Sequence, residues 1–544
     1  MTAVLCMEHL TVALPPGADR SHALEDVSLS LGTNEILCIV GESGSGKSMT
    51  AGAILGLLPE GVQATAGRIL LEGRNLLDLS DAELRGIRGA RIGMIFQEPM
   101  TALNPLRTVG DQIAEMFRTH TDLGSAEIAR QVTGLLQDVH IPDPEAAGRA
   151  YPHELSGGQR QRAMIAMALA LEPHVLIADE PTTALDVTTQ AQILKLIREL
   201  QQRKGTAVLF ITHDFGVVAE IADRVAVMQH GRLVEEGPAE EVLNQPKHPY
   251  TRALIAAVPP LVPPAPQNVA VDPILRIEHV SKTYRKGGLL SRNRRVTHAV
   301  RDANLVLPRG GTLGIVGESG SGKSTLARCI VRLLDPDSGA IRLGDTDLTS
   351  LSRKAMREES RRIQMVFQVP FASLNPRRRA GELVAQGPIV HGETRAKALA
   401  RAKELFALVG LDADATERYP HEFSGGQRQR IGLARALALE PEVLIADEPV
   451  SALDVSVQAQ VLRLLADLRS RLGLSMVFIT HDLRVAAQIC DRIAVMKDGV
   501  VVEEGTTADV FTTPHHAYTR MLLESVPGRT WTPPVRQGDL LAAS

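Results

Sequence analysis

Short apolar runs that end at glycine-rich or acidic segments recur along this chain of 544 residues. One run spans Glu35–Val40, and a second run of the same kind spans Gly311–Val316. Runs of this length, bounded by turn residues, are typical of strands buried in a parallel sheet. Longer stretches with helical apolar spacing begin at Arg160 and Arg428. The pattern therefore predicts an α/β fold.

The whole pattern occurs twice. YPHELSGGQRQRAMIAMALALEPHVLIADEPTTALDV begins at Tyr151, and a near-copy begins at Tyr419. A repeat of this length indicates a domain duplication rather than an array of short repeats. The segment Val258–Pro273 holds six prolines and is typical of a linker. We therefore expect domains at 1–257 and 274–527, a linker at 258–273, and a C-terminal tail at 528–544 for which order and disorder both stay open.

Each copy carries the octapeptide GESGSGKS directly after an apolar run. Glycines in such a loop let backbone N–H groups face phosphate oxygens, and the helix that follows adds the positive end of its dipole. Lys47 and Lys323 are expected to neutralise the β- and γ-phosphates, and Ser48 and Ser324 to bind Mg²⁺. The expected phosphate-loop residues are Gly41, Glu42, Ser43, Gly44, Ser45, Gly46, Lys47 and Ser48 in the first copy, and Gly317, Glu318, Ser319, Gly320, Ser321, Gly322, Lys323, Ser324 and Thr325 in the second.

Composition restricts the setting of the protein. A hydrophobic content of 44%, a charged content of 22% and a net charge of −4 describe an ordinary soluble protein without a nucleic-acid signature. The sequence has no apolar run long enough to span a membrane, and Glu8 argues against a signal peptide. The cysteines Cys6, Cys38, Cys329 and Cys490 are scattered, so we expect buried thiols in a reducing cytosol.

Further motifs follow each phosphate loop in the same order. They are a glutamine after an apolar run, a Ser-Gly-Gly-Gln signature, an apolar run that ends in Asp-Glu, an Ala-Leu-Asp segment and an Ile-Thr-His-Asp segment. In the first copy the motif residues are Gln97, Ser156, Gly157, Gly158, Gln159, Asp179, Glu180, Asp186 and His213. In the second copy they are Gln368, Ser424, Gly425, Gly426, Gln427, Asp447, Glu448, Asp454 and His481.

This set resembles the ATP-binding cassette (ABC) ATPases over essentially the full length of the chain. The resemblance implies two tandem P-loop NTPase domains, each with a RecA-like core, an antiparallel β subdomain and a helical subdomain. It also implies an enzyme that hydrolyses ATP with Mg²⁺ as the metal ion.

The chemistry of each motif agrees with that activity. Asp179 and Asp447 end buried strands, where ligands of α/β sheets gather, and they are suited to holding Mg²⁺. Glu180 and Glu448 are suited to polarising or deprotonating the attacking water. Gln97 and Gln368 are expected to touch both Mg²⁺ and this water, and His213 and His481 to hydrogen-bond the γ-phosphate. Asp186 and Asp454 complete the expected nucleotide-binding set.

The resemblance further implies that two copies work head to tail. The signature Ser424–Gln427 would then complete the site of Lys47, and Ser156–Gln159 would complete the site of Lys323. In the second copy Tyr284 stands where the family stacks an aromatic ring on adenine, whereas the first copy has Leu14. We therefore expect weaker nucleotide binding at the first site.

Two other regions narrow the function. The stretches Val109–Arg149 and Gly381–Arg418 correspond to the region that, in transporters of this family, receives a helix of the membrane subunit together with the glutamine loop. The tails Asn244–Pro259 and Thr512–Pro527 resemble the segment found in oligopeptide and dipeptide importers. Many of those relatives bind an iron–sulfur cluster in this tail. The tails here contain no cysteine, so we predict no cluster.

Together these features predict the fused double ATPase subunit of a bacterial ABC importer, with di- or oligopeptides as the expected substrate class. The expected partners are two integral-membrane permease subunits, as a heterodimer, and an extracytoplasmic substrate-binding protein, with no nucleic acid. The expected location is the cytoplasmic face of the inner membrane, as a peripheral protein. A soluble tandem ABC ATPase that acts on ribosomes or nucleic acid is the alternative. The transported substrate stays open, because selectivity resides in other subunits.

Overall fold

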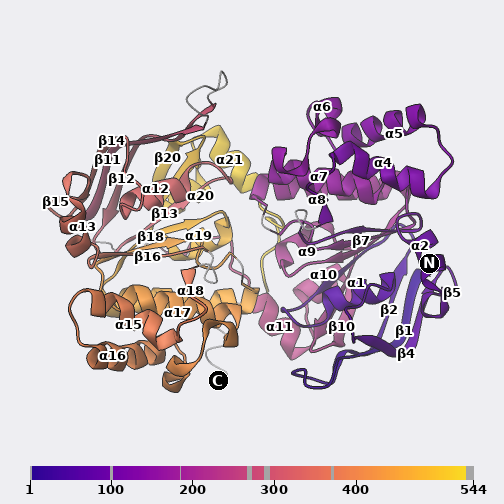
Figure 1. Ribbon diagram of the computed structural model, residues 1–544, viewed down its shortest axis with the longest axis horizontal. Coiled ribbons are helices and arrows are strands. Elements are labelled where there is room, and N and C mark those ends of the chain that lie inside the picture. Colours follow the sequence, from indigo (N-terminus) through magenta and orange to yellow (C-terminus); the bar gives the residue numbers. More distant parts are fainter. Residues whose placement is uncertain are drawn as a thin grey trace. The chain divides into compact units, whose positions relative to one another are not determined.

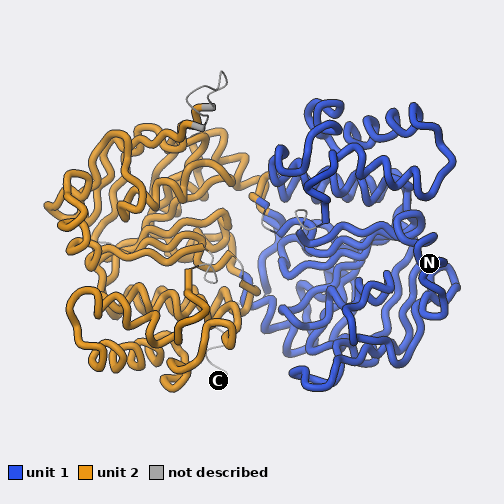
Figure 2. The backbone as a smooth tube through the Cα atoms, in the orientation of Figure 1, with its two compact units in different colours: residues 1–185, 189–258, 527–544 blue, residues 186–188, 259–526 orange. Residues whose placement is uncertain are grey.

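A computed structural model describes residues 3–98, 102–183, 185–265, 272–286, 295–368, 373–451 and 453–534. The chain divides into two compact units (Figure 2). The first unit holds the chain up to Leu185, Thr189–Val258 and the segment that begins at Pro527, and the second holds Asp186–Thr188 and Pro259–Val526. Parts of the expected glutamine loops (99–101 and 369–372), of the linker (266–271) and of the C-terminal tail (535–544) lie outside the described residues.

The first unit is built around a sheet with the strand order β10-β9-β3-β8-β7-β6 (Figure 1). Its strands are β3 (Ile36–Val40), β6 (Ile92–Ile95), β7 (Val175–Asp179), β8 (Ala207–Ile211), β9 (Arg224–Gln229) and β10 (Arg232–Pro238). All neighbours pair in parallel except β9 and β10. Every residue of β3, β7 and β8 is buried, as expected for a parallel sheet covered on both faces.

A separate antiparallel sheet in the first unit has the order β2-β1-β4-β5. Its strands are β1 (Ala3–Ala13), β2 (His22–Gly32), β4 (Gln63–Leu71) and β5 (Arg74–Asn75). Leu5 and Met7 of β1 share one apolar core with Leu37 of β3 and Ile54 of the helix that follows the phosphate loop. This shared core fixes the phosphate loop between the two sheets.

The helices of the first unit fall into two groups. One group forms a subdomain between the glutamine and the signature, with α4, α5, α6 and α7 lying together in Figure 1. The helices are α1 (Lys47–Leu55), α2 (Asp81–Ile87), α4 (Val109–His120), α5 (Ser125–Asp138), α6 (Pro144–Arg149), α7 (Gly157–Ala168), α8 (Val187–Lys204), α9 (Phe215–Ile221), α10 (Ala239–Asn244) and α11 (Pro249–Ala256).

The second unit repeats this architecture, with sheets in the orders β16-β17-β18-β13-β19-β20 and β12-β11-β14-β15. Its strands are β11 (Pro273–Lys286), β12 (Arg295–Pro308), β13 (Thr312–Val316), β14 (Ser338–Leu343), β15 (Thr346–Asp347), β16 (Ile363–Val366), β17 (Val443–Asp447), β18 (Ser475–Thr480), β19 (Arg492–Lys497) and β20 (Val500–Thr506). Its helices are α12 (Lys323–Ile330), α13 (Arg353–Glu359), α15 (Ala380–Val390), α16 (Arg395–Leu408), α17 (Gly425–Leu437), α18 (Val455–Leu472), α19 (Leu483–Ile489), α20 (Thr507–Thr512) and α21 (Ala517–Glu524).

Each unit thus combines an α/β core, an antiparallel β subdomain and a helical subdomain, which confirms the predicted fold class. In both units the phosphate loop follows the carboxyl end of a central strand, and the Asp-Glu motif ends a neighbouring strand. Carboxyl ends of parallel strands are where α/β proteins bind ligands. The fold therefore collects the predicted site residues at one edge of each core sheet.

Candidate functional site

The phosphate loops can adopt their conformation only with glycine at fixed places. Gly41 has φ 153°, and a Cβ atom there would lie 2.3 Å from the Met228 carbonyl oxygen. Gly317 repeats this with φ 149° and a distance of 2.2 Å to the Met496 carbonyl oxygen. The loop is therefore pressed against the end of a neighbouring strand, and its amides line the start of the helix.

The lysine of each loop is buried and bound to the loop itself. Nζ of Lys47 donates to the carbonyl oxygens of Gly41 at 2.8 Å and Glu42 at 3.0 Å. Nζ of Lys323 donates to Gly317 at 2.7 Å and to Glu318 at 2.8 Å. Burial lowers the pKa of Lys323. A buried ammonium at the start of the helix is well placed to bind an anionic group such as a phosphate.

A hydroxyl and a carboxylate meet next to each lysine. Ser48 Oγ donates to Asp179 Oδ1 at 3.2 Å, and Ser324 Oγ donates to Asp447 Oδ1 at 3.0 Å. Burial raises the pKa of both aspartates, although the serine hydroxyls partly offset the rise. Buried oxygen donors whose ionised form needs a cation have the chemistry that Mg²⁺ prefers. These residues therefore fit the predicted metal ion.

The glutamate after each aspartate has a left-handed backbone. Glu180 has φ 46° and Glu448 has φ 48°, which is unusual for a residue with a side chain. The amide of Glu180 nevertheless stays in the sheet and donates to the Ile211 carbonyl oxygen at 2.9 Å. Such a conformation costs about 1–3 kcal/mol and is concentrated at functional sites. It sends two consecutive carboxylates in different directions.

Each glutamate is held by a glutamine and a histidine. Gln97 Nε2 donates to Glu180 Oε2 at 3.0 Å, and His213 Nδ1 lies 3.2 Å from Glu180 Oε1. Thr183 Oγ1 adds a bond of 2.9 Å to Glu180 Oε2, a contact that the motif pattern did not predict. Burial acts to raise the pKa of Glu180, but the hydrogen bond and charge of His213 outweigh it and lower the pKa to about 2.

The second unit repeats the arrangement. Gln368 Nε2 donates to Glu448 Oε2 at 2.8 Å, and His481 Nδ1 lies 3.2 Å from the same oxygen. Burial opposes ionisation on both sides, but the pair lowers the pKa of Glu448 and raises the pKa of His481. In each unit the structure therefore brings together the predicted glutamine, glutamate and histidine from three separate segments.

The signature serines begin helices. Ser156 is the N-cap of α7 and accepts from the Gln159 amide, and Ser424 caps α17 through Gln427 in the same way. In both cases the serine amide donates in return to Oε1 of the glutamine side chain, so each signature forms a closed capping box. Within each unit the signature is thus a rigid and exposed helix start.

Three other predicted residues have clear surroundings. Asp186 Oδ1 accepts from the Thr188 hydroxyl at 2.8 Å, and Asp454 is the N-cap residue of α18. Tyr284 lies on β11 with 40% of its surface exposed. Leu14 packs against the core of the first unit instead. An accessible ring is therefore present at this position in the second unit and absent in the first.

The motif pattern missed one contact at each phosphate loop. The amide of Glu42 donates to Tyr250 Oη at 3.1 Å, and the amide of Glu318 donates to Tyr518 Oη at 3.2 Å. Both tyrosines lie in the tail helices α11 and α21. The repeated tyrosine at the same place in both tails was the only sequence signal for this contact.

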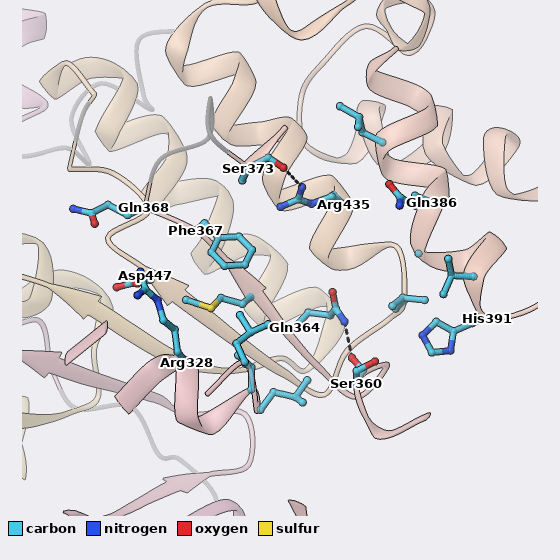
Figure 3. A pocket seen from close by; sticks show the side chains of 18 residues that line it. Arg328, Ser360, Gln364, Phe367, Gln368, Ser373, Gln386, His391, Arg435 and Asp447 are labelled. Carbon is cyan, nitrogen blue, oxygen red and sulfur yellow. Dashed lines mark hydrogen bonds between the residues drawn. The ribbon is translucent and has the colours of Figure 1, made fainter. Parts of the chain in front are cut away.

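A groove of about 770 Å³ separates the core of the second unit from its helical subdomain (Figure 3). Phe367 and Gln368 lie on its core side, and Gly387 of α15 lies on its helical side. Arg435 Nη1 donates to the Ser373 carbonyl oxygen at 2.6 Å, and burial lowers the pKa of Arg435. The residues that line the groove from the α15 side are Leu383, Gln386, Gly387, Val390 and His391.

The first unit differs at the matching place. Met116 occupies the position in α4 that Gly387 occupies in α15, and its ε-methyl group packs within 2.4 Å of where a Cβ of Gly89 would lie. The first unit therefore has a flexible thioether side chain where the second unit has a glycine that lines the groove and lies next to Leu439.

Among the described residues, no helix has both the length and the apolar content needed to cross a membrane. The family model described as "ABC transporter" matches residues 24–183 and 300–451. The model described as "Oligopeptide/dipeptide transporter, C-terminal region" matches residues 234–279 and 502–534.

Curated relatives extend the match to nearly the full chain. The protein named "Glutathione import ATP-binding protein GsiA" from Shigella boydii serotype 4 (strain Sb227) is 47% identical over 96% of this chain and 89% of its own length. The protein of the same name from Escherichia coli (strain K12) gives the same figures. The chain therefore belongs to the ABC transporter family, with two ABC ATPase domains that are each followed by an oligopeptide/dipeptide transporter C-terminal region.

Proposed function

We propose that this chain is the ATP-hydrolysing subunit that powers a bacterial ABC importer. The observation that carries this proposal is the partly buried glutamate directly after β7 and after β17, held by a glutamine and a histidine beside a phosphate loop. Family membership agrees with the ATPase activity, and the importer tails agree with transport into the cell.

The phosphate loops bind the triphosphate of ATP. Lys47 and Lys323 exchange their loop carbonyls for β- and γ-phosphate oxygens, which satisfies a buried ammonium with a stronger acceptor. Loop amides and the starts of α1 and α12 supply further donors and a favourable dipole. In the second unit the accessible ring of Tyr284 stacks on adenine.

The metal site is formed by Ser48, Gln97 and Asp179 in the first unit, and by Ser324, Gln368 and Asp447 in the second. Bound Mg²⁺ would neutralise charge on the β- and γ-phosphates. The hydroxyl–carboxylate pairs at 3.2 Å and 3.0 Å support this assignment. Ionisation of the aspartates, which burial disfavours, becomes favourable when a cation binds.

Glu180 and Glu448 orient the attacking water. A carboxylate with a pKa of about 2 is ionised at neutral pH, so Glu180 accepts a hydrogen bond from the water that attacks the γ-phosphorus. Gln97 and His213 hold this carboxylate in place from two sides. Attack forms a bond from the water oxygen to phosphorus and breaks the bond to the β–γ bridging oxygen, which leaves on ADP.

Each phosphate loop forms half of a complete site. The capped and exposed signatures Ser156–Gln159 and Ser424–Gln427 offer rigid helix N-termini to the γ-phosphate bound by the other copy. ATP then joins the two cassettes, and hydrolysis releases them. This cycle drives alternating access in the permease.

The importer requires membrane partners. We assign the groove beside Gln368 to a cytoplasmic helix of a permease subunit, because it connects the helical subdomain to a residue that contacts the catalytic glutamate. The difference between Gly387 and Met116 supports two different permease subunits, one for each cassette. A substrate-binding protein outside the membrane completes the system. The chain itself lies at the cytoplasmic face of the inner membrane.

The transported substrate is a peptide-like molecule. The matched C-terminal region is named for oligopeptide and dipeptide transporters, and the relatives are named for glutathione import. Glutathione is itself a small peptide, so both names indicate the same chemical class.

Two measurements test the proposal together. The purified chain should hydrolyse ATP in the presence of Mg²⁺, and affinity capture from detergent-solubilised membranes should recover two permease subunits. Recovery of ribosomes in place of permeases would overturn the importer assignment in favour of a soluble tandem ATPase. Absence of ATP hydrolysis with the permeases present would overturn the assigned catalytic residues.

A further inference from the structure

The tail helix of each unit touches the phosphate loop directly. Tyr250 of α11 accepts a hydrogen bond from the Glu42 amide at 3.1 Å, and its hydroxyl lies 3.4 Å from Glu42 Oε2. Tyr518 of α21 accepts from the Glu318 amide at 3.2 Å. The contact joins segments separated by 208 residues in the first unit and 200 in the second. Because the contact occurs in both copies, it is a regular feature of this fold rather than a chance approach of two segments.

A strand glutamate fixes the start of each tail helix. Glu235 of β10 accepts from the amides of Lys247 at 2.7 Å and His248 at 3.0 Å, directly before α11. His248 Nδ1 then accepts from the Tyr250 amide at 3.2 Å as the helix cap. Tyr250 therefore lies in the first turn of a helix whose start is fixed by hydrogen bonds. These bonds set the position of the Tyr250 hydroxyl.

The second unit has the same anchor. Glu503 of β20 accepts from the amides of His515 at 2.7 Å and His516 at 3.1 Å. His516 Nδ1 accepts from the Tyr518 amide at 3.1 Å. Both tails therefore have the same arrangement of strand glutamate, capping histidine and tyrosine. We infer that the glutamate and the tyrosine act together.

The strand that holds the tail is also tied to the loop. The turn between β9 and β10 donates from the Gly231 amide to the Ser45 carbonyl oxygen at 2.9 Å. Gly499 donates to Ser321 at 3.0 Å in the second unit. Two segments therefore hydrogen-bond to each phosphate loop: the tyrosine binds its first turn, and the hairpin of β9 and β10, or of β19 and β20, binds its later turn. The contact at the first turn comes from the importer-type tail.

The loop residue that hydrogen-bonds to the tyrosine in the first unit, Glu42, is also a partner of the lysine. Lys47 Nζ donates to the carbonyl oxygen of Glu42, while the amide of the same residue donates to Tyr250. If the lysine leaves this carbonyl for a phosphate, the hydrogen bond from the Glu42 amide to the tyrosine still ties the same residue to the tail helix. A change in the lysine's partner thus reaches the tail helix through one residue.

We propose that Tyr250 and Tyr518 are positioning residues of the two ATP sites, through which the importer-type tails respond to bound nucleotide. This inference rests on the proposed binding of ATP at the phosphate loops. The tyrosines fix the first turn of each loop in the form that ATP requires. Nucleotide binding in turn changes the stability of the start of each tail helix.

The two tyrosines differ in burial and in sequence surroundings. Tyr518 is only 4% exposed, and Lys497 Nζ lies 4.9 Å from the centre of its ring. A cation over an aromatic face stabilises the position of that ring. The first unit has Gln229 at the position of Lys497, and Tyr250 is half-buried.

The test uses the full-length chain with Mg-ATP and the variants Tyr250→Phe and Tyr518→Phe. These variants keep the ring and remove only the hydroxyl. Loss of one such hydrogen bond should raise the KM for ATP by about three- to tenfold in the double variant, with kcat changed less than twofold. Tyr151→Phe and Tyr419→Phe serve as matched controls, because both rings are exposed and stack on His153 and His421 away from the loops.

Hydrogen exchange supplies a second readout that general destabilisation would not reproduce. A non-hydrolysable ATP analogue should change exchange at the start of α11 and α21 in the wild-type chain. Tyr250→Phe should abolish this response in α11 alone, and Tyr518→Phe in α21 alone. Glu235→Gln and Glu503→Gln, which release the anchor and leave the rings unchanged, should weaken the same responses.

The outcomes separate this inference from the proposed function. A wild-type chain that neither binds nor hydrolyses ATP would overturn the proposed function itself. A wild-type chain with normal ATPase activity, combined with unchanged KM and unchanged exchange responses in the Phe variants, would overturn the inference alone.

Discussion

His213 Nδ1 lies 3.2 Å from Glu180 Oε1, and the His481–Glu448 pair has the same separation in the second unit. Each histidine holds the ionised carboxylate that, in the proposed mechanism, orients water. The isosteric variants Glu180→Gln and Glu448→Gln remove this charge and keep the shape. We expect the double variant to bind ATP with near-normal affinity and to lose at least about 100-fold in turnover.

The measurement is steady-state ATP hydrolysis together with equilibrium binding of ATP. The single variants should each retain part of the activity, because the other site is intact. Hydrolysis at the wild-type rate in the double variant would contradict the assigned role of these glutamates.

Ser48→Ala and Ser324→Ala should weaken the use of Mg²⁺ by the enzyme. The hydroxyls donate to Asp179 and Asp447, and each would supply an oxygen ligand. The expected result is a rise of about tenfold in the Mg²⁺ concentration for half-maximal ATPase activity. Ser80→Ala, which removes the cap of α2, should leave this Mg²⁺ dependence unchanged.

Leu14→Tyr should strengthen nucleotide binding at the first site. It places an aromatic ring where the second unit has Tyr284, and base stacking contributes about 1–3 kcal/mol per base. Titration with a fluorescent ATP analogue should show a lower Kd for the weaker of the two sites, by about tenfold. Tyr284→Leu should produce the opposite shift at the other site, and unchanged affinities in both variants would contradict the stacking role.

Gly387→Met should close the groove of the second unit. A methionine there reproduces the Met116 of the first unit and adds a side chain to the wall of the groove, beside Leu439. We expect loss of one permease subunit in capture from solubilised membranes, with the ATPase activity of the isolated chain unchanged. Met116→Gly is the matched control, and it should leave that permease subunit bound. Full recovery of both subunits with Gly387→Met would contradict the docking assignment.

The anchors of the tail helices should respond to acid. Burial acts to raise the pKa of Glu235 and Glu503, but the adjacent threonine side chains and the hydrogen bonds from backbone amides outweigh it and lower the pKa of both. A carboxylate with a lowered folded-state pKa stabilises the fold above its unfolded pKa and loses this contribution as pH falls through the folded value. We therefore expect lower protection from hydrogen exchange at the starts of α11 and α21 below about pH 4.5, with each rate compared with the intrinsic rate at the same pH.

The matching variants Glu235→Gln and Glu503→Gln should show low protection at neutral pH and little further loss of protection with acid. Equal protection of the tail at neutral and acid pH in the wild-type chain would contradict the anchoring role.

Sequence patterns predicted the elements whose geometry is local. A glycine-rich loop before a helix and an apolar run ending in Asp179 each follow from short-range sterics and burial, and the structure has both. The left-handed conformation of Glu180 has no local signal, because it depends on a sheet hydrogen bond to Ile211. Thr183 was missed for the same reason, since only the turn after Glu180 brings its hydroxyl to the carboxylate.

Contacts between distant segments were beyond the sequence pattern. The bond from Glu42 to Tyr250 spans 208 residues, and nothing in the spacing of either motif specifies which atoms meet. The groove that Gly387 lines is likewise a property of packing between α15 and the core. From sequence alone, a glycine in a helix is equally consistent with another segment packed closely against it and with empty space beside it.

The groove beside Gly387 also has a pharmacological consequence. A small molecule shaped for this hollow meets a methionine side chain at the matching place in the first cassette, so it would distinguish two halves of one polypeptide. The residues that line the groove include Gln368 and Asp447 but none of the phosphate loop. A compound that binds only against α15 would therefore act beside the nucleotide site and leave its phosphate loop open.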